Sequence, residues 1–303
     1  MSLQRRLTSQ HVDARLWQHR RVSGDSSTYD DVTAVLALKG FATAKSRLDL
    51  PLPLRQRLAW TMAVDTLRAL AAVVGRLVVV SDQPALQSRL RRVGVEVSVI
   101  DDGGSTGLNA ALARGAAVSG PGPVLACVGD LPALRPRSVQ RILAAMRDSP
   151  ADRSFLVDAS GVGTTMLGVR EGTLEPRFQG RSAAAHHQSG AVGLSDEVLG
   201  GSVADARQDV DNRFDLMTAA GLGLGLETGA LIVPGTGHTG AFEVVTTTGW
   251  RAPDGEPLAV SARGRRLRLA PAALASGLRP LRSGQRLHAV VHDDRVLYAW
   301  MPS

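Results

Sequence analysis

Lysine is rare in this chain of 303 residues, and its two lysines, Lys39 and Lys45, lie close together in VLALKGFATAKSRL (35–48). Arginine supplies every other basic side chain, including Arg47 in the same stretch. A lysine ammonium is a compact charge on a flexible stem, and it reaches phosphate oxygens readily. The alternative is a solvated loop. We expect Lys39, Lys45 and Arg47 to bind the phosphates of a nucleotide, because the loop after the first strand of an α/β sheet is a common phosphate site.

An aspartate ends the apolar stretch PVLACVGD (123–130), and Pro132 stops the chain from continuing as regular structure. A carboxylate at the end of a strand is well placed to hold Mg²⁺, which prefers oxygen ligands. The alternative is a turn residue or a helix cap. We expect Asp130 to be a metal ligand.

A second acidic segment is QDVDN (208–212), in which Asp209 and Asp211 point to the same side if the chain is extended. The stretch after it has helical character, so Asp211 or Asn212 could instead cap that helix. The sequence supports a metal ligand and a cap equally.

Two further clusters could bind substrates. In DDGGSTGLNAAL (101–112), Gly107 allows close approach by a ligand, and Asn109 offers a donor and an acceptor to a base or ribose. The second cluster combines hydroxyl groups with cations, which suits a phosphorylated carboxylic acid. Its members are Thr164, Thr165, Arg177, Arg181, Ser182 and His186.

Alternating strands and helices must position these residues. Continuous apolar runs predict strands at 33–39, 77–81, 95–100 and 123–130, and helical spacing separates them at 54–73, 84–94, 106–119 and 135–148. A hairpin is expected from 154–158 and 164–169. This alternation is typical of a mostly parallel, doubly wound sheet with helices on both faces. Ligands of such sheets bind beyond the carboxyl ends of the strands, where the residues above occur.

The remaining sequence predicts a second, smaller domain. We expect a flexible tail at 1–30, an α/β domain at 31–228, a Gly/Pro-rich linker at 229–237 and a small all-β barrel at 238–303. The barrel contains short β-like runs separated by turns.

Composition limits the class of protein. The chain is 44% hydrophobic and 21% charged, as in ordinary globular proteins. Its single cysteine excludes an intramolecular disulfide framework, and no apolar run approaches the roughly 20 residues that span a bilayer. We therefore expect a cytoplasmic protein without membrane partners. The net charge of +7 is concentrated at the two ends, which indicates either nucleic-acid contact or, as we favour, an arginine-rich surface.

The motifs resemble those of a known family. K-x5-K-S-R-L, T-G-L-N-A-A, G-D-L-P-A-L, G-x-G-T, R-F and D-V-D occur across residues 32–220 in the order seen in the guanylyltransferases of coenzyme F-420 biosynthesis. These enzymes belong to the molybdopterin-guanylyltransferase-like nucleotidyltransferases, with a nucleotide-diphospho-sugar-transferase-like fold. The resemblance implies GTP as the donor, Mg²⁺ as the cofactor, and phosphoenolpyruvate or 2-phospholactate as the acceptor.

Site residues follow from the resemblance position by position. It implies Lys39 and Lys45 at the nucleotide phosphates, Asp130 and Asp211 at Mg²⁺, and Thr164 and Ser182 at the acceptor. Related enzymes have glycine directly after R-F, where this chain has Gln179. Either the loop shifts by one residue or the acceptor pocket differs.

The implied reaction needs no general base, because the acceptor phosphate is already ionised when it attacks the α-phosphorus of GTP. Phosphoenolpyruvate is the favoured acceptor, with 2-phospholactate and 3-phosphoglycerate as alternatives, and the choice of guanine comes from the family alone. Another nucleotidyltransferase, acting on a molybdopterin or a sugar phosphate, is a second possibility.

The C-terminal module resembles a cold-shock-type OB barrel. Trp250 is the single aromatic residue in the stretch where base-stacking residues would lie. We expect a packing or oligomerisation role, such as a homodimer, rather than a nucleic-acid-associated regulator.

Overall fold

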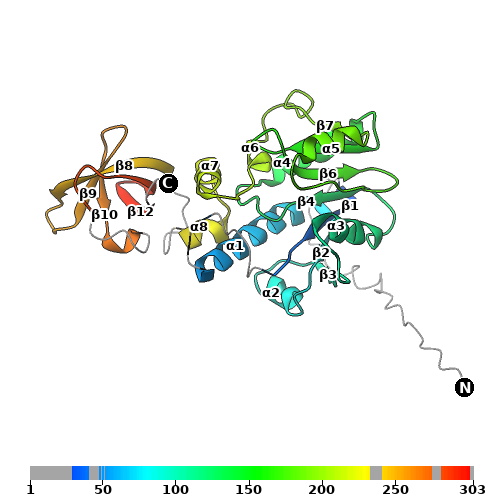
Figure 1. The fold of residues 1–303 in the computed structure, drawn as a ribbon, viewed down its shortest axis with the longest axis horizontal. Helices are drawn as coiled ribbons and strands as arrows, with labels where there is room; N and C mark the ends of the chain where they lie inside the picture. The colour runs from blue at the N-terminus through cyan, green and yellow to red at the C-terminus, as the bar shows by residue number, and fades with distance from the viewer. Residues whose placement is uncertain are drawn as a thin grey trace, which may run out of the picture.

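The computed structural model describes residues 29–40, 48, 50, 52–232, 241–274 and 281–300. A large α/β part and a small barrel lie side by side, with helices between them (Figure 1). The expected tail lies outside the described residues except for its last two positions, and so do Lys45 and Arg47.

A mixed seven-stranded sheet forms the centre of the α/β part. Its order is β3-β2-β1-β4-β6-β5-β7, and β3, β2, β1 and β4 are parallel. β6 runs antiparallel to both of its neighbours and forms the expected hairpin with β5. The strands are β1 (Tyr29–Ala37), β2 (Val74–Val80), β3 (Ser98–Ile100), β4 (Val124–Cys127), β5 (Arg153–Val157), β6 (Thr164–Val169) and β7 (Val192–Gly193). The prediction of a mostly parallel sheet is confirmed.

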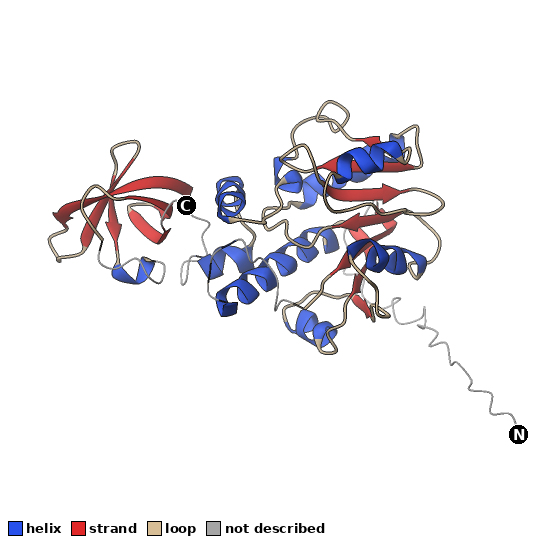
Figure 2. Ribbon diagram, viewed as in Figure 1, coloured by secondary structure: helices blue, strands red, loops and turns tan. Residues whose placement is uncertain are grey.

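Helices cover both faces of this sheet (Figure 2). On one face, α1 (Leu52–Ala71), α2 (Leu86–Arg92) and α4 (Pro136–Asp148) share a core with β1 and β2. On the other face, α3 (Leu108–Ala117) packs on β1 and β2, and α5 (Ser182–Gln188) lies beside β5. The approach of α3 is close, since a Cβ atom at Gly115 would lie 2.3 Å from Val35 Cγ1. Burial on both faces explains why the strands have continuous apolar runs.

The C-terminal part is a closed five-stranded barrel, as expected. Its order is β10-β12-β11-β8-β9, and β10 and β12 form a parallel pair while the other pairs are antiparallel. A five-stranded Greek-key barrel is the architecture of OB-folds. The elements are β8 (Ala241–Arg251), β9 (Pro257–Ser261), β10 (Arg266–Leu269), the 3₁₀ turn η3 (Pro271–Ala273), β11 (Arg286–His292) and β12 (Arg295–Trp300).

Three short helices, α6 (Ala204–Arg207), α7 (Arg213–Leu222) and α8 (Leu226–Ile232), connect the two parts. Residues 229–232, expected to begin the linker, are therefore helical, whereas 233–237 lie outside the described residues. The cause is a cap from α1. The Asp65 carboxylate accepts from the backbone N–H groups of Glu227 (3.0 Å) and Thr228 (2.8 Å), and this satisfies the first turn of α8.

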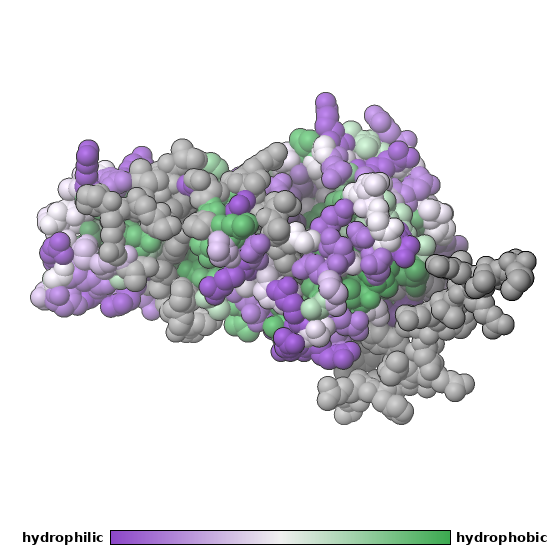
Figure 3. Space-filling model, turned by 60° about the horizontal axis from the view of Figure 1, so that its bottom comes forward, coloured by the Kyte–Doolittle hydropathy of each residue, from purple (hydrophilic) through white to green (hydrophobic). Residues whose placement is uncertain are grey.

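Apolar side chains join the barrel to these helices. Val290 of β11 packs in one cluster with Leu58, Ala220 and Ile232, and α7 contacts β8. In the space-filling view, apolar residues gather near this junction, while hydrophilic residues cover much of the outer surface (Figure 3). Among the described residues, no helix has the length and apolar character needed to cross a membrane.

Candidate active site

Lys39 and the glycine-rich loop meet beyond the carboxyl ends of β1 and β3. The Lys39 ammonium donates to the backbone oxygen of Ser105 at 3.3 Å. The carboxylates of Asp101 and Asp102 turn this loop by accepting from the N–H groups two residues later, and Gly107 precedes α3 with φ of 117°. Since an ammonium group has three hydrogens, Lys39 has donors left for a phosphate bound beside Ser105.

Asn109 connects this loop to the loop that carries Gln179. Its amide donates to the Phe178 carbonyl at 3.0 Å and accepts from the Phe178 N–H at 2.7 Å. Both halves of the amide are thus used within the chain. The structure assigns Asn109 to holding the two loops together, and its contact with the nucleotide stays a prediction, as do the contacts of Gly107, Lys45 and Arg47.

The loop around Asp130 is held from several directions. A Cβ atom at Gly129 would lie 2.6 Å from Leu38 Cδ2, so a glycine before Asp130 lets β4 end close to β1. The buried Thr66 hydroxyl of α1 accepts from the Leu131 N–H at 3.0 Å, and Gly225 donates to the Pro132 carbonyl at 2.7 Å. These bonds fix the half-buried Asp130 at the edge of the sheet.

The second acidic segment lies directly against Asp130. The Val210 N–H donates to the Asp130 carbonyl at 3.1 Å, and the Val210 side chain is fully buried. The helix cap is Asn212, whose side chain accepts from the N–H groups of Phe214 and Asp215 in a capping box. The capping role therefore does not fall on Asp211, which is exposed.

The donor atoms at this edge fit Mg²⁺. Asp130 and the segment that carries Asp209 and Asp211 offer hard carboxylate oxygens. Burial raises the pKa of the Cys127 thiol well above its usual value, and the nearby Asp130 charge raises it further, so a thiolate is not available as a ligand. Within the described residues, no group of three or more His, Cys, Asp or Glu side chains could hold a metal. Mg²⁺ commonly binds one or two carboxylates and takes its other ligands from phosphates and water.

Thr164 begins β6 beside the end of β4. Cys127 pairs with Met166 and the Val128 N–H donates to the Thr165 carbonyl, so the antiparallel register places Thr164 opposite Gly129. The pairing of β6 with β5 shifts by one residue here, a β-bulge of the kind that redirects side chains near active sites. Thr164 and Thr165 are both buried, and the hydroxyl of Thr165 has no hydrogen-bond partner in the described part of the chain. Its contact with the acceptor stays a prediction.

The loop from Arg177 to Ser182 carries an uncommon backbone conformation. Gln179 has φ of 87° and Gly180 has φ of 58°. Gln179 and Gly180 thus both adopt the left-handed conformation that favours glycine. The Gln179 side chain is exposed, as is that of Arg181, whereas Ser182 is buried. The choice between a shifted loop and a different acceptor pocket stays open, and the contact of Gln179 with the acceptor stays a prediction.

His186 is not a cation, contrary to the sequence-based interpretation. Its side chain is fully buried, and burial is the main reason that its pKa falls to about 4. Sequence reasoning missed this and the Asn109–Phe178 bonds, because both depend on contacts between segments that are distant in the sequence.

A family model described as "MobA-like NTP transferase domain" matches residues 50–293. The chain belongs to this family. Its relatives include the phosphoenolpyruvate guanylyltransferase of Salinispora arenicola (strain CNS-205), which is 42% identical over 204 residues, covering 66% of this chain and 92% of that protein. Those of Streptomyces coelicolor (strain ATCC BAA-471 / A3(2) / M145) and Streptomyces scabiei (strain 87.22) are each 43% identical, over 208 and 218 residues, and 94% and 98% of their lengths are covered.

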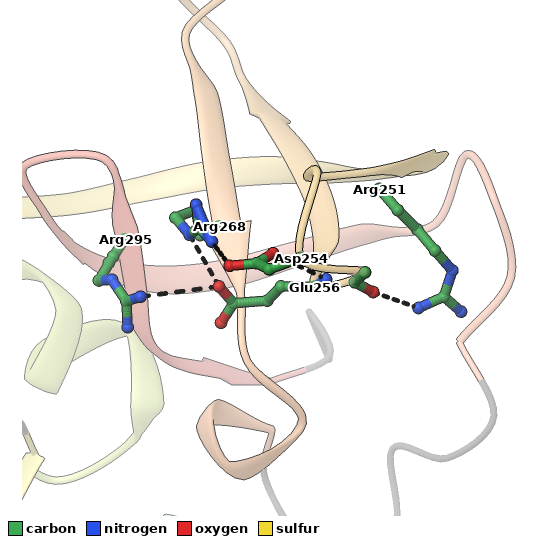
Figure 4. A network of polar contacts seen from close by, with 6 residues as sticks. Arg251, Asp254, Glu256, Arg268 and Arg295 are labelled. Atoms are coloured by element: carbon green, nitrogen blue, oxygen red, sulfur yellow. Dashed lines mark hydrogen bonds and ion pairs between the residues drawn. The ribbon is translucent and has the colours of Figure 1, made fainter.

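In this MobA-like NTP transferase, the barrel shows strong internal charge pairing. Arg268 donates to Glu256 at 2.8 Å and also pairs with Asp254, while Arg295 lies 3.7 Å from Glu256 (Figure 4). The loop between β8 and β9, which carries both acids, corresponds to a ligand-binding loop of OB-folds. The absence of a nucleic-acid site stays a prediction.

Proposed function

We propose that the protein transfers GMP from GTP to phosphoenolpyruvate and releases pyrophosphate, as a step in coenzyme F-420 biosynthesis. The observation that carries this proposal is the position of Asp130 against the Asp209–Asp211 segment, at the same sheet edge as Lys39 and Thr164. The names of the relatives, matched over nearly their full length, support the same reaction.

The chain's own residues would orient two anions against one another. Lys39 would bind the phosphates of GTP beside the glycine-rich loop, and Lys45 and Arg47 would add positive charge there. Asp130 and Asp211 would hold Mg²⁺, which, when bound, offsets the negative charge of the phosphates. Positioning and charge neutralisation are what phosphoryl-type transfers require.

The bond changes need no proton transfer. An oxygen of the acceptor phosphate forms a bond to the α-phosphorus of GTP. The bond from the α-phosphorus to the bridging oxygen of the β-phosphate breaks, and pyrophosphate leaves with that electron pair. The acceptor would lie near Thr164, Gln179, Arg181 and Ser182, on the far side of Asp130 from Lys39. GTP and phosphoenolpyruvate are metabolites of the cytoplasm, and we expect the protein to act there.

The test is pyrophosphate release with Mg²⁺ across a matrix of substrates. GTP, ATP or CTP would each be combined with phosphoenolpyruvate, 2-phospholactate or 3-phosphoglycerate. We expect release with GTP and phosphoenolpyruvate, and loss of release when Mg²⁺ is chelated. Release with a different acceptor would correct the substrate, and no release with any pair would overturn the proposal.

A further inference from the structure

His186 lies in a closed environment that determines which of its ring nitrogens carries the hydrogen. The ring is fully buried between Phe155 and Phe178, with ring centroids 5.7 and 5.2 Å away. The backbone N–H of Arg177 donates to His186 Nε2 at 2.9 Å. An accepting nitrogen bears no hydrogen, so the neutral ring carries its hydrogen on Nδ1.

This tautomer fixes the direction of the next hydrogen bond. His186 Nδ1 lies 3.0 Å from the hydroxyl oxygen of Thr164. The ring is therefore the donor and the hydroxyl is the acceptor. Thr164 cannot return its own hydrogen to Nδ1, and the structure gives its hydroxyl no other hydrogen bond among the described residues. That hydrogen remains available to a ligand at the sheet edge.

The direction matters because the expected acceptor is an anion. An anion accepts hydrogen bonds and offers no hydrogen, so it binds a hydroxyl only through the hydroxyl's own hydrogen. The opposite tautomer would draw the Thr164 hydrogen toward the ring and turn the oxygen lone pairs toward the anion. The tautomer of His186 thus decides whether Thr164 attracts or repels the acceptor.

We propose that His186 is a positioning residue, which holds Thr164 as a hydrogen-bond donor to the anionic acceptor. The inference rests on the proposed function, because it takes the acceptor to be a phosphorylated carboxylic acid bound beside Asp130. Through Arg177, the same ring also ties Thr164 to the loop that carries Gln179.

Burial, together with nearby positive charges, keeps the ring neutral. Burial is the largest cause that lowers the pKa of His186 to about 4, and the positive charges of Arg177 and Arg153 lower it further, while a hydrogen bond with the Ser182 backbone acts in the opposite direction. Glu175 pairs with Arg153 at 2.7 Å. The ring therefore stays in the donating, neutral form above about pH 5.

Two amide variants separate the bond to Thr164 on the Nδ1 side of the ring from the bond to Arg177 on its Nε2 side. The amide of asparagine lies near the place of Nδ1, and the longer glutamine amide lies near that of Nε2. His186→Asn therefore retains a donor to Thr164, and His186→Gln retains an acceptor for Arg177. We expect His186→Gln to raise the KM for phosphoenolpyruvate about tenfold, as for one lost hydrogen bond, with the KM for GTP unchanged. We expect His186→Asn to stay within about threefold of the natural protein.

Thr164 supplies the matched controls. Thr164→Val removes the hydroxyl and should raise the KM for phosphoenolpyruvate by a similar factor, whereas Thr164→Ser retains the hydroxyl and the low KM. The Thr164→Val, His186→Gln double variant should be no worse than Thr164→Val alone, because both changes remove one contact. Three results would overturn the inference and leave His186 with a structural role. They are additive losses in the double variant, equal effects of His186→Asn and His186→Gln, and equal rises in the KM values for phosphoenolpyruvate and GTP.

Binding and tautomer measurements distinguish failure of this inference from failure of the proposed function. Calorimetric titration with phosphoenolpyruvate does not depend on turnover. If the natural protein binds phosphoenolpyruvate without transferring GMP, and His186→Gln binds it more weakly, the inference holds and the proposed function is wrong. If the natural protein does not bind phosphoenolpyruvate, both are wrong. A ¹⁵N spectrum, with His186→Asn to identify the signal, should show the Nδ1–H tautomer, and the Nε2–H tautomer would overturn the inference by itself.

Discussion

The backbone N–H of Val210 donates to the carbonyl of Asp130 at 3.1 Å, and this bond joins two acidic segments that are far apart in the sequence. Because Val210 is buried in the core, the bond places Asp209 and Asp211 beside Asp130 at the edge of the sheet. The proposed binding of Mg²⁺ at Asp130 and Asp211 depends on this relationship.

Replacing Asp130 tests the metal assignment. We expect Asp130→Asn to lower kcat at least about 100-fold, because an amide oxygen lacks the charge that binds Mg²⁺. The melting temperature should change little, since the backbone of this loop holds its contacts. The exposed Asp148, at the end of α4 and away from the carboxyl edge, provides Asp148→Asn as a control with unchanged kcat. Near-normal turnover of Asp130→Asn would contradict the assignment.

Asp211 and Asn212 should have separable roles. Asp211→Asn should raise the Mg²⁺ concentration for half-maximal activity about tenfold and leave stability unchanged. Asn212→Ala removes the cap of α7 and should lower the free energy of unfolding by about 1 kcal/mol. Magnesium titrations and urea unfolding of both variants check this. A loss of stability alone in Asp211→Asn would mean that Asp211 is not a ligand.

Gln179 should affect the acceptor and not the nucleotide. Gln179→Gly relieves a left-handed backbone conformation and should raise the free energy of unfolding by up to about 1 kcal/mol. It also removes an exposed amide beside the proposed acceptor site, so the KM for phosphoenolpyruvate should change while that for GTP stays constant. Gln179→Ala removes the amide but retains the strain. If both variants have unchanged KM values, the side chain does not face the acceptor.

The pKa of His186 predicts the pH dependence of stability. The folded-state pKa of about 4 lies below the ordinary value of 6.5, so between these values the unfolded chain binds more protons than the folded chain. Stability should therefore fall as the pH is lowered from 6.5 to 4, by at most about 3 kcal/mol from this group. His186→Asn should lack this component. Subtracting the free energies of unfolding of the two proteins at each pH removes the contributions of other groups, such as Asp65, whose pKa is raised by burial. A difference that does not depend on pH would contradict the prediction.

The barrel should not bind single-stranded nucleic acid. Arg268 and Arg295 are paired with Asp254 and Glu256, so these two arginines are engaged within the barrel. We expect no retention of single-stranded RNA in a filter-binding series, even at low salt, where phosphate contacts are strongest. Salt-dependent retention would revive a regulatory role for the barrel.

Sequence patterns predicted the features that depend on neighbouring residues in the chain. Apolar strand ends predicted where Lys39 and Asp130 would lie, and β-like runs separated by turns predicted the barrel. Tertiary contacts decided the rest. The first turn of α8 is capped by Asp65, 162 residues away from Glu227, and a cap from so distant a residue cannot be read from the local sequence. Asn109 bonds a loop 69 residues away, and the charge state of His186 depends on the ring's burial.

Phosphorus NMR of one reaction tests the central claim most directly. The protein would be mixed with GTP, phosphoenolpyruvate and Mg²⁺, and the products followed in the ³¹P spectrum. We expect pyrophosphate together with two new, mutually coupled signals, from a phosphoanhydride that joins the α-phosphorus to the phosphate of phosphoenolpyruvate. Unchanged substrates, or pyrophosphate accompanied by GMP alone, would contradict it.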